Sequence, residues 1–134
     1  MKSLCFAALL LVVSPVFAGD KSKVSVDGNW VVVCMEKDGA PVSEAKDSVI
    51  TAKGDTFKCS KTGMTWKIDF ADKGMVNVQA TEGEGKAPVA KTGVCVQGND
   101  FIALCLHDAN SSTSTDGAQK NKCTILLKRE GASK

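Results

Sequence analysis

The sequence predicts an all-β protein, an eight-stranded antiparallel β-barrel, and three observations lead to this class. Helical periodicity is almost absent from the chain. Short runs in which apolar and polar residues alternate recur at near-regular intervals, with turn residues between them. Eight antiparallel strands in an open sheet would leave two exposed edges, and closure into a barrel removes both. A two-sheet β-sandwich is the alternative architecture.

Residues 1–18, "MKSLCFAALLLVVSPVFA", are expected to form a secretory signal peptide. They contain Lys2, then an apolar run, then small residues at the cleavage point, which are the three parts of such a signal. The apolar run is shorter than the roughly 20 residues that cross a bilayer. Cleavage after Ala18 would leave one domain, residues 19–134, in a secreted or periplasmic protein.

The charge of this predicted mature chain excludes partners that require a strongly basic surface. The whole sequence has 17 Lys and Arg against 15 Asp and Glu, and the signal peptide contains one lysine and no acidic residue. A nearly neutral balance does not fit binding to nucleic acid or to an anionic membrane. No later segment is apolar and long enough to span a membrane.

Five cysteines follow the signal peptide, which itself contains Cys5. They are Cys34, Cys59, Cys95, Cys105 and Cys123. Disulfides are expected because oxidising compartments allow them to persist, and the odd number predicts two disulfides and one free thiol. Cys95 with Cys105, in one hairpin, is one predicted pair, and Cys34 with Cys123, joining the first strand to the last, is its rival.

The first half of the mature chain is expected to contain four strands. Their ranges are 29–36, 48–52, 56–61 and 64–70. The first is an apolar run that ends at the turn "KDGAP", and the second, "SVITA", is rich in β-branched residues. The third, "TFKCSK", follows a "KGD" turn, and the fourth, "MTWKIDF", has the clearest alternation, with Trp66, Ile68 and Phe70 facing inward. Between the first two strands, "SEAKD" is expected to form one helical turn capped by Ser43.

The second half is expected to contain four more strands. Their ranges are 75–81, 92–97, 100–106 and 122–129. In the first of these, Val76, Val78 and Ala80 face inward. Residues 82–91 are expected to be a flexible connection, and Gly98-Asn99 a two-residue hairpin turn. Residues 109–121, "ANSSTSTDGAQKN", are expected to be a polar loop.

Several segments resemble, in order and spacing, a lipocalin-like domain family abundant in planctomycete bacteria. These segments are "DGNWVVVCMEKDGAPVSE", "GDTF", "WKIDF", "KTGVCVQGNDFIALCLHD" and "ILLKRE". The chain departs from the family where "TDGAQKNKC" replaces an Arg-Pro-aromatic sequence, and where Val94 or Cys95 replaces a tyrosine after Gly93. The resemblance implies a small exported lipocalin-like barrel, a scaffold associated with binding small apolar molecules.

No catalytic site, metal site or cofactor is expected. Cys105, His107 and Asp108 are a candidate metal or nucleophile group, but a metal would need ligands from elsewhere and the cysteine is expected to be in a disulfide. No Gly-x-Ser-x-Gly sequence is present, and "EGEGK" lacks the Gly-Lys-Ser/Thr ending of a phosphate loop. The sequence therefore predicts a protein that is not an enzyme.

The expected function is binding of a small apolar or amphipathic ligand inside the barrel. The candidate ligand-binding residues are Trp30, Trp66, Phe70, Val78, Ala80 and Ala103. The simpler interpretation of the two tryptophans is that they pack the core. The alternative function is a secreted protein-interaction module, such as an inhibitor of an extracellular hydrolase, that contacts its partner through residues 82–91 and 108–121. An eight-stranded barrel is wide enough either to be filled by side chains or to hold one small ligand.

Overall fold

A computed structural model of the protein describes residues 25–83, 85–109 and 121–132. The strands are β1 (Gly28–Lys37), β2 (Ala40–Pro41), β3 (Val49–Lys53), β4 (Thr56–Cys59), β5 (Thr65–Phe70), β6 (Met75–Thr81), β7 (Val89–Gln97), β8 (Phe101–Asp108) and β9 (Cys123–Arg129). Two single-turn 3₁₀ helices, η1 (Ser43–Ala45) and η2 (Asp72–Gly74), lie between them. No helix in these described ranges is long and apolar enough to cross a membrane.

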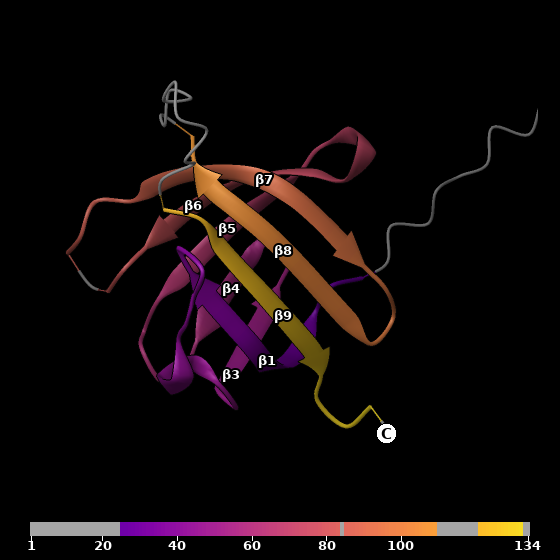
Figure 1. Ribbon diagram of the computed structural model, residues 1–134. Helices are drawn as coiled ribbons and strands as arrows, with labels where there is room; N and C mark the ends of the chain where they lie inside the picture. The colour runs from indigo at the N-terminus through magenta and orange to yellow at the C-terminus, as the bar shows by residue number, and fades with distance from the viewer. Residues whose placement is uncertain (1–24, 84, 110–120, 133–134) are drawn as a thin grey trace, which may run out of the picture.

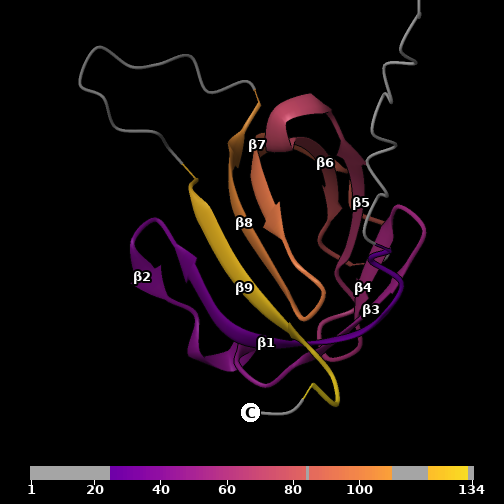
Figure 2. The same cartoon turned by 90° about the vertical axis from the view of Figure 1, so that its right-hand side faces the viewer.

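Eight of the strands form a closed antiparallel barrel, which confirms the predicted fold. From β3 to β9 each strand pairs with the next along the chain, and β1 pairs with both β3 and β9 to complete the ring. Figures 1 and 2 show β9, in yellow, beside β1, in indigo, with the other strands wrapped around the same interior. The short strand β2 pairs with β1 outside the ring. This closure rules out the two-sheet sandwich.

The alternation of side chains along the strands fills the barrel interior with one hydrophobic core. Trp66 and Ile68 of β5 and Val76, Val78 and Ala80 of β6 are buried, as their spacing predicted. Ile50, Phe57, Ile102 and Leu127 are completely buried and come from four other strands. Each strand therefore contributes an inner face, because residues two apart point to the same side.

A β-bulge in β1 changes the inner face of that strand. The pairing with β9 shifts between Val32, opposite Leu127, and Cys34, opposite Leu126. The additional residue, Val33, turns Cys34 to the exposed outer face and leaves Met35 packed against the core. Such bulges bend a strand and increase its twist, which helps the sheet to close.

Three local predictions were wrong, each because a pairing with another strand decides the structure. Strand β7 begins at Val89, inside the predicted flexible connection, because it pairs with Ala80 and prolongs the ladder with β6. The hairpin turn is Asn99-Asp100, since the Gly98 amide donates to the Phe101 carbonyl. The helical turn η1 is present, but Val42 is its N-cap and Ser43 lies within it.

The predicted disulfides are not present, and all five described cysteines are free thiols. The shifted hairpin register places Cys95 opposite Leu104, on the inner face, and Cys105 opposite Val94, on the outer face. Cys34 likewise faces outward, whereas Cys123 is buried. Neither predicted pair has both sulfurs on one side of the sheet. The predicted signal peptide and residues 110–120 of the predicted polar loop lie outside the described residues.

Candidate functional site: an open cavity at one end of the barrel

One end of the barrel contains an open cavity of about 840 Å³. Its wall comes from the segment before β1, the β3–β4 turn, the end of β5, the η2 turn and the inner face of β7. The residues that line it are Ser25, Val26, Asp27, Gly54, Asp55, Ile68, Asp69, Phe70, Ala71, Asp72, Lys73, Gly74, Met75, Cys95 and Gln97. Ligand pockets commonly have volumes of about 300 to 1,000 Å³, so this cavity is large enough for one small molecule.

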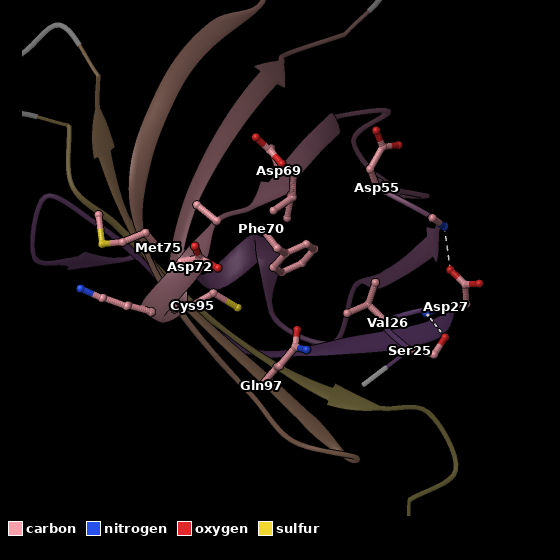
Figure 3. A pocket seen from close by; sticks show the side chains of 15 residues that line it. Ser25, Val26, Asp27, Asp55, Asp69, Phe70, Asp72, Met75, Cys95 and Gln97 are labelled. Carbon is pink, nitrogen blue, oxygen red and sulfur yellow. Dashed lines mark hydrogen bonds between the residues drawn. The ribbon is translucent and has the colours of Figure 1, made fainter. Parts of the chain in front are cut away.

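The floor of the cavity is mainly apolar. Ile68 and Phe70 lie two residues apart on β5 and therefore share its inner face, and Cys95 reaches the same space from β7. Ile68 and Cys95 are buried, whereas Phe70, at the end of β5, is half-buried. Figure 3 shows the Phe70 ring at the centre of the lining side chains.

The Cys95 thiol contributes an uncharged group to this floor. Burial raises its pKa to about 11, because removal from water penalises the thiolate. Cys95 is therefore a protonated thiol at neutral pH. It behaves as a small, weakly polar part of an apolar surface.

Four aspartates belong to the segments that form the rim of the cavity. They are Asp27, Asp55, Asp69 and Asp72. The side chain of Asp69 points to the outer face of β5, because Asp69 lies between the inward-facing Ile68 and Phe70. Asp27 accepts a hydrogen bond of 2.6 Å from the Gly54 amide, and Asp55 lies 3.6 Å from the ammonium group of Lys67 in an exposed ion pair. The side chains of Asp69 and Asp72 have no hydrogen bond or ion pair with the described residues. Lys73 is the one basic residue among those that line the cavity.

Arg129, near the end of the chain, holds the N-terminal wall in place. Its guanidinium donates to the backbone oxygens of Asp27 and Ser25, at 2.9 and 3.0 Å. Trp30 Nε1 donates to the Val26 carbonyl at 2.8 Å. These bonds explain why residues 25–27, which precede the first strand, form part of the cavity.

The cavity includes one of the six predicted ligand-binding residues, Phe70. Trp30, Trp66, Val78 and Ala80 are packed in the core and do not line this cavity. Ala103 lies on the outer face of β8, between the buried Ile102 and Leu104. Its predicted inward position was wrong because Ile102, Leu104 and Leu106 occupy the inner face of β8, and adjacent residues of a strand point to opposite faces.

Sequence reasoning missed most of the cavity. Val26, Ile68 and Cys95 supply its apolar part together with Phe70, and Asp27, Asp55 and Asp72 supply carboxylates at its rim. A signal for the mouth was present, because each aspartate lies in a turn or within two residues of a strand end. The sequence did not indicate that these turns gather at the same end of the barrel.

The opposite end has a partly buried ion pair on its inner side. Lys91 Nζ lies 2.6 Å from Asp108 Oδ1, and the two side chains are 17% and 25% exposed. Asn121 donates a second hydrogen bond, of 2.5 Å, to Asp108. The hydrogen bond from Lys91 is the main cause that lowers the pKa of Asp108, and Asn121 adds to it against the opposing effect of burial. These polar groups make this end chemically different from the apolar cavity.

The metal or nucleophile candidates do not form a site with one another. Cys105 is exposed on the outer face, where the Thr124 hydroxyl lies 3.9 Å from its sulfur. His107 Nδ1 lies 3.1 Å from the Asp108 carbonyl oxygen, while the Asp108 carboxylate is paired with Lys91. Within the described ranges, no three His, Cys, Asp or Glu side chains are grouped as metal ligands would be.

Among the described thiols whose pKa is shifted, Cys59 is the one whose pKa is lowered. Burial alone would raise the pKa of Cys59. This effect is outweighed by hydrogen bonds from the side chain and backbone of Thr62 and from the backbone of Lys61, together with the positive charge of Lys61. The pKa of Cys59 is therefore lowered. These donors lie in the β4–β5 turn. Cys59 is 6% exposed, so its sulfur has little access to a substrate.

No protein-family model, no curated protein and no solved structure matched the chain.

Proposed function

We propose that the protein is an exported lipocalin-like barrel that binds one small apolar or amphipathic ligand in the cavity at its open end and catalyses no reaction. The observation that carries this proposal is the cavity of about 840 Å³ with Ile68, Phe70 and Cys95 in its floor. A pocket with an apolar floor and a few polar groups at its mouth is the common form of a small-molecule site. The proposed location, secreted or periplasmic, rests on the sequence of residues 1–18.

The size and shape of the cavity favour a ligand with a compact apolar body. Phe70 offers a half-buried aromatic surface, and an apolar group that covers it would be removed from water. Each Å² of apolar surface buried in this way contributes about 25 cal/mol. A ligand that covers the floor would therefore be held mainly by the hydrophobic effect, and its polar end would face the mouth.

Titration of the purified protein with a hydrophobic fluorescent probe tests this function. Saturable uptake with one site is expected. Cys95→Phe would place a ring in the cavity and should abolish uptake, whereas Val94→Phe, on the outer face of the same strand, is the matched control and should retain it.

Phe70→Ala provides a second test if Cys95→Phe fails to fold. Removing the ring from the cavity should weaken probe binding by about tenfold, equivalent to about 1.4 kcal/mol. Phe101→Ala removes an exposed ring from the outer face and should leave binding unchanged. Absence of saturable uptake by the unmodified protein would overturn the proposed function.

A protein-interaction role is the second candidate, and the outer face of the barrel favours it. Met75, Val94, Val96 and Phe101 point outward and are 45 to 60% exposed, and Met75 pairs directly with Val94. Contiguous exposed apolar side chains often mark an interaction site. A partner with an uncharged apolar surface would suit this face, and a second copy of the chain presents such a surface.

Sedimentation velocity tests this second candidate. Concentration-dependent dimers that disappear in Val96→Lys would support it. A monomer at every concentration, together with saturable probe uptake, would favour the binding barrel.

A further inference from the structure

Gln97 is a polar residue at an inward position of the barrel wall, at the end that holds the cavity. It lies two residues after the buried Cys95 and directly opposite the buried Ile102 of β8, so its side chain points to the interior as theirs do. Val96, between Cys95 and Gln97, is 60% exposed on the outer face. Gln97 itself is partly buried and lines the cavity.

The other inward side chains around Gln97 are uncharged and mainly apolar. Ile68 and Phe70 come from β5, Val76 from β6 and Cys95 from β7. Burial of a polar side chain in such surroundings costs free energy unless it forms hydrogen bonds, and an apolar residue would avoid that cost. A position where packing alone would favour an apolar residue is a candidate for ligand recognition.

The Gln97 amide can bond to the protein and to a ligand at the same time. Its nitrogen has two N–H donors and its oxygen has two lone pairs, so a contact within the protein leaves other sites for a guest. Gln97 is the last residue of β7 and therefore lies closer to the mouth than Cys95. Figure 3 shows its amide end on the side of the cavity that faces the Phe70 ring. A molecule that covers Phe70 would thus have the amide beside its polar end.

We propose that Gln97 determines the specificity of the cavity by hydrogen bonding to an uncharged polar group, such as a hydroxyl or a carbonyl, on a ligand whose apolar body covers Ile68 and Phe70. This inference rests on the proposed function, because it assigns a chemical class to the ligand of the same cavity. A hydrogen bond satisfies a neutral group. An ionised group beside Gln97 would lose water without gaining an opposite charge, since no inward side chain of the described strands β5 to β8 is charged at this end of the barrel.

Displacement of the bound fluorescent probe by four ligands built on naphthalene tests this specificity. Naphthalene has no polar group, 2-naphthol carries a neutral hydroxyl, and 2-naphthoate and 2-naphthylmethylammonium carry opposite charges. 2-Naphthol should bind about three- to tenfold more tightly than naphthalene, which is the range expected of one net hydrogen bond. Both ions should bind more weakly than 2-naphthol.

The variant Gln97→Leu tests whether this residue causes the preference. Leucine is similar in size and has no donor or acceptor in its side chain. Affinity for 2-naphthol should therefore fall by about three- to tenfold, while affinity for naphthalene does not fall. Gln79→Leu is the matched control, because Gln79 is exposed on the outer face of β6, and both affinities should be unchanged in it.

The side-chain amide signals in heteronuclear NMR spectra provide a readout on the unmodified protein if Gln97→Leu fails to fold. At equal occupancy, 2-naphthol should shift the Nε2 proton signals of Gln97 more than naphthalene does. The corresponding signals of Gln79 should stay in place with both ligands.

Four outcomes would overturn the role of Gln97. They are equal affinities of the unmodified protein for 2-naphthol and naphthalene, tightest binding of either ion, an unchanged affinity for 2-naphthol or an equal loss of both ligands in Gln97→Leu, and unshifted Gln97 amide signals. Saturable uptake of the fluorescent probe would leave the proposed function standing in each of these cases. No uptake of the probe and no binding of any of the four ligands would overturn both.

Discussion

The guanidinium carbon of Arg129 lies over the indole ring of Trp30, 4.3 Å from the ring centroid. The same guanidinium donates to the backbone oxygens of Ser25, Asp27 and Asn99. One side chain at the end of β9 thus fixes the buried tryptophan of β1, the wall of the cavity and the β7–β8 turn. Gly28 is part of this arrangement, since it has a φ of +128° and a Cβ there would lie 3.0 Å from Arg129 Nη1.

Arg129→Met is expected to lower the free energy of unfolding by about 2 to 3 kcal/mol, because it removes three charge-assisted hydrogen bonds and the cation–π contact. Arg129→Lys should retain little of the free energy of unfolding that Arg129→Met loses, since an ammonium cannot reproduce the planar set of donors of the guanidinium. Lys128→Met, one residue earlier on the same strand, is the control. Urea denaturation measures the three values, and an equal loss in Lys128→Met and Arg129→Met would contradict the role given to Arg129.

Gly93→Ala is expected to destabilise the barrel by more than about 2 kcal/mol. Gly93 lies on the inner face of β7 opposite Leu106, and a Cβ at this position would collide with the carbonyl oxygen of Cys105. The collision is with backbone, so two strands would have to move apart. Thr92→Ala, at the adjacent position, loses side-chain hydrogen bonds and should cost about 1 kcal/mol or less. Thermal melts of the two variants compare these effects, and a Gly93→Ala protein as stable as the unmodified one would show that the strands can move apart at little cost.

The barrel was predictable from the sequence because its main signal is local. The alternation of Trp66, Ile68 and Phe70, and of Val76, Val78 and Ala80, follows from the pleat of one strand, and the structure confirms it. The inward position predicted for Ala103 was wrong because it conflicts with the same alternation, in which Ile102, Leu104 and Leu106 face inward. The partners across the hairpin were not predictable, because the turn is displaced by one residue and each residue of β8 pairs two positions further along β7. Short-range patterns do not fix that register.

The cavity was less predictable, because it exists only after the ring has closed. Phe70 was identified from its own strand, but Cys95 reaches the same space from another strand and Val26 from the segment before β1. Val26 lies there because Trp30 and Arg129 hold that segment, through hydrogen bonds that include one between residues 104 positions apart. No periodicity in the sequence encodes such a contact.

The thiols are expected to react in two groups in the folded protein. Cys34 and Cys105 are exposed, whereas Cys59, Cys95 and Cys123 are buried. Iodoacetamide at neutral pH should therefore modify the first two rapidly and the other three only after unfolding, because reaction requires access to the sulfur as well as its ionisation. Peptide mapping by mass spectrometry after timed labelling measures the five rates. Bridged peptides in the unreduced protein would contradict the free thiols of the structure and restore the disulfides that the sequence predicted.

The stability of the protein is expected to fall above pH 9 in part because of Cys95. Burial raises the pKa of its thiol from an ordinary value of 9.0 to about 11 in the folded state. Between these values the unfolded chain releases the proton while the folded protein keeps it, so the free energy of unfolding decreases as pH rises. The contribution is fully present below pH 9 and is lost as pH approaches 11, with a limit of about 2 to 3 kcal/mol.

Cys95→Val isolates this contribution, because it keeps the apolar floor and removes the ionisable group. Urea denaturation at intervals from pH 8 to about 11 should show a shallower decline for Cys95→Val than for the unmodified protein. The exposed Cys34→Val is the control and should leave the slope unchanged. Some decline should persist in Cys95→Val, because burial also raises the pKa of Cys123. If Cys95→Val and the unmodified protein lost stability in parallel over this range, the Cys95 thiol would ionise as readily in the folded protein as in the unfolded chain, and the floor of the cavity would be open to water.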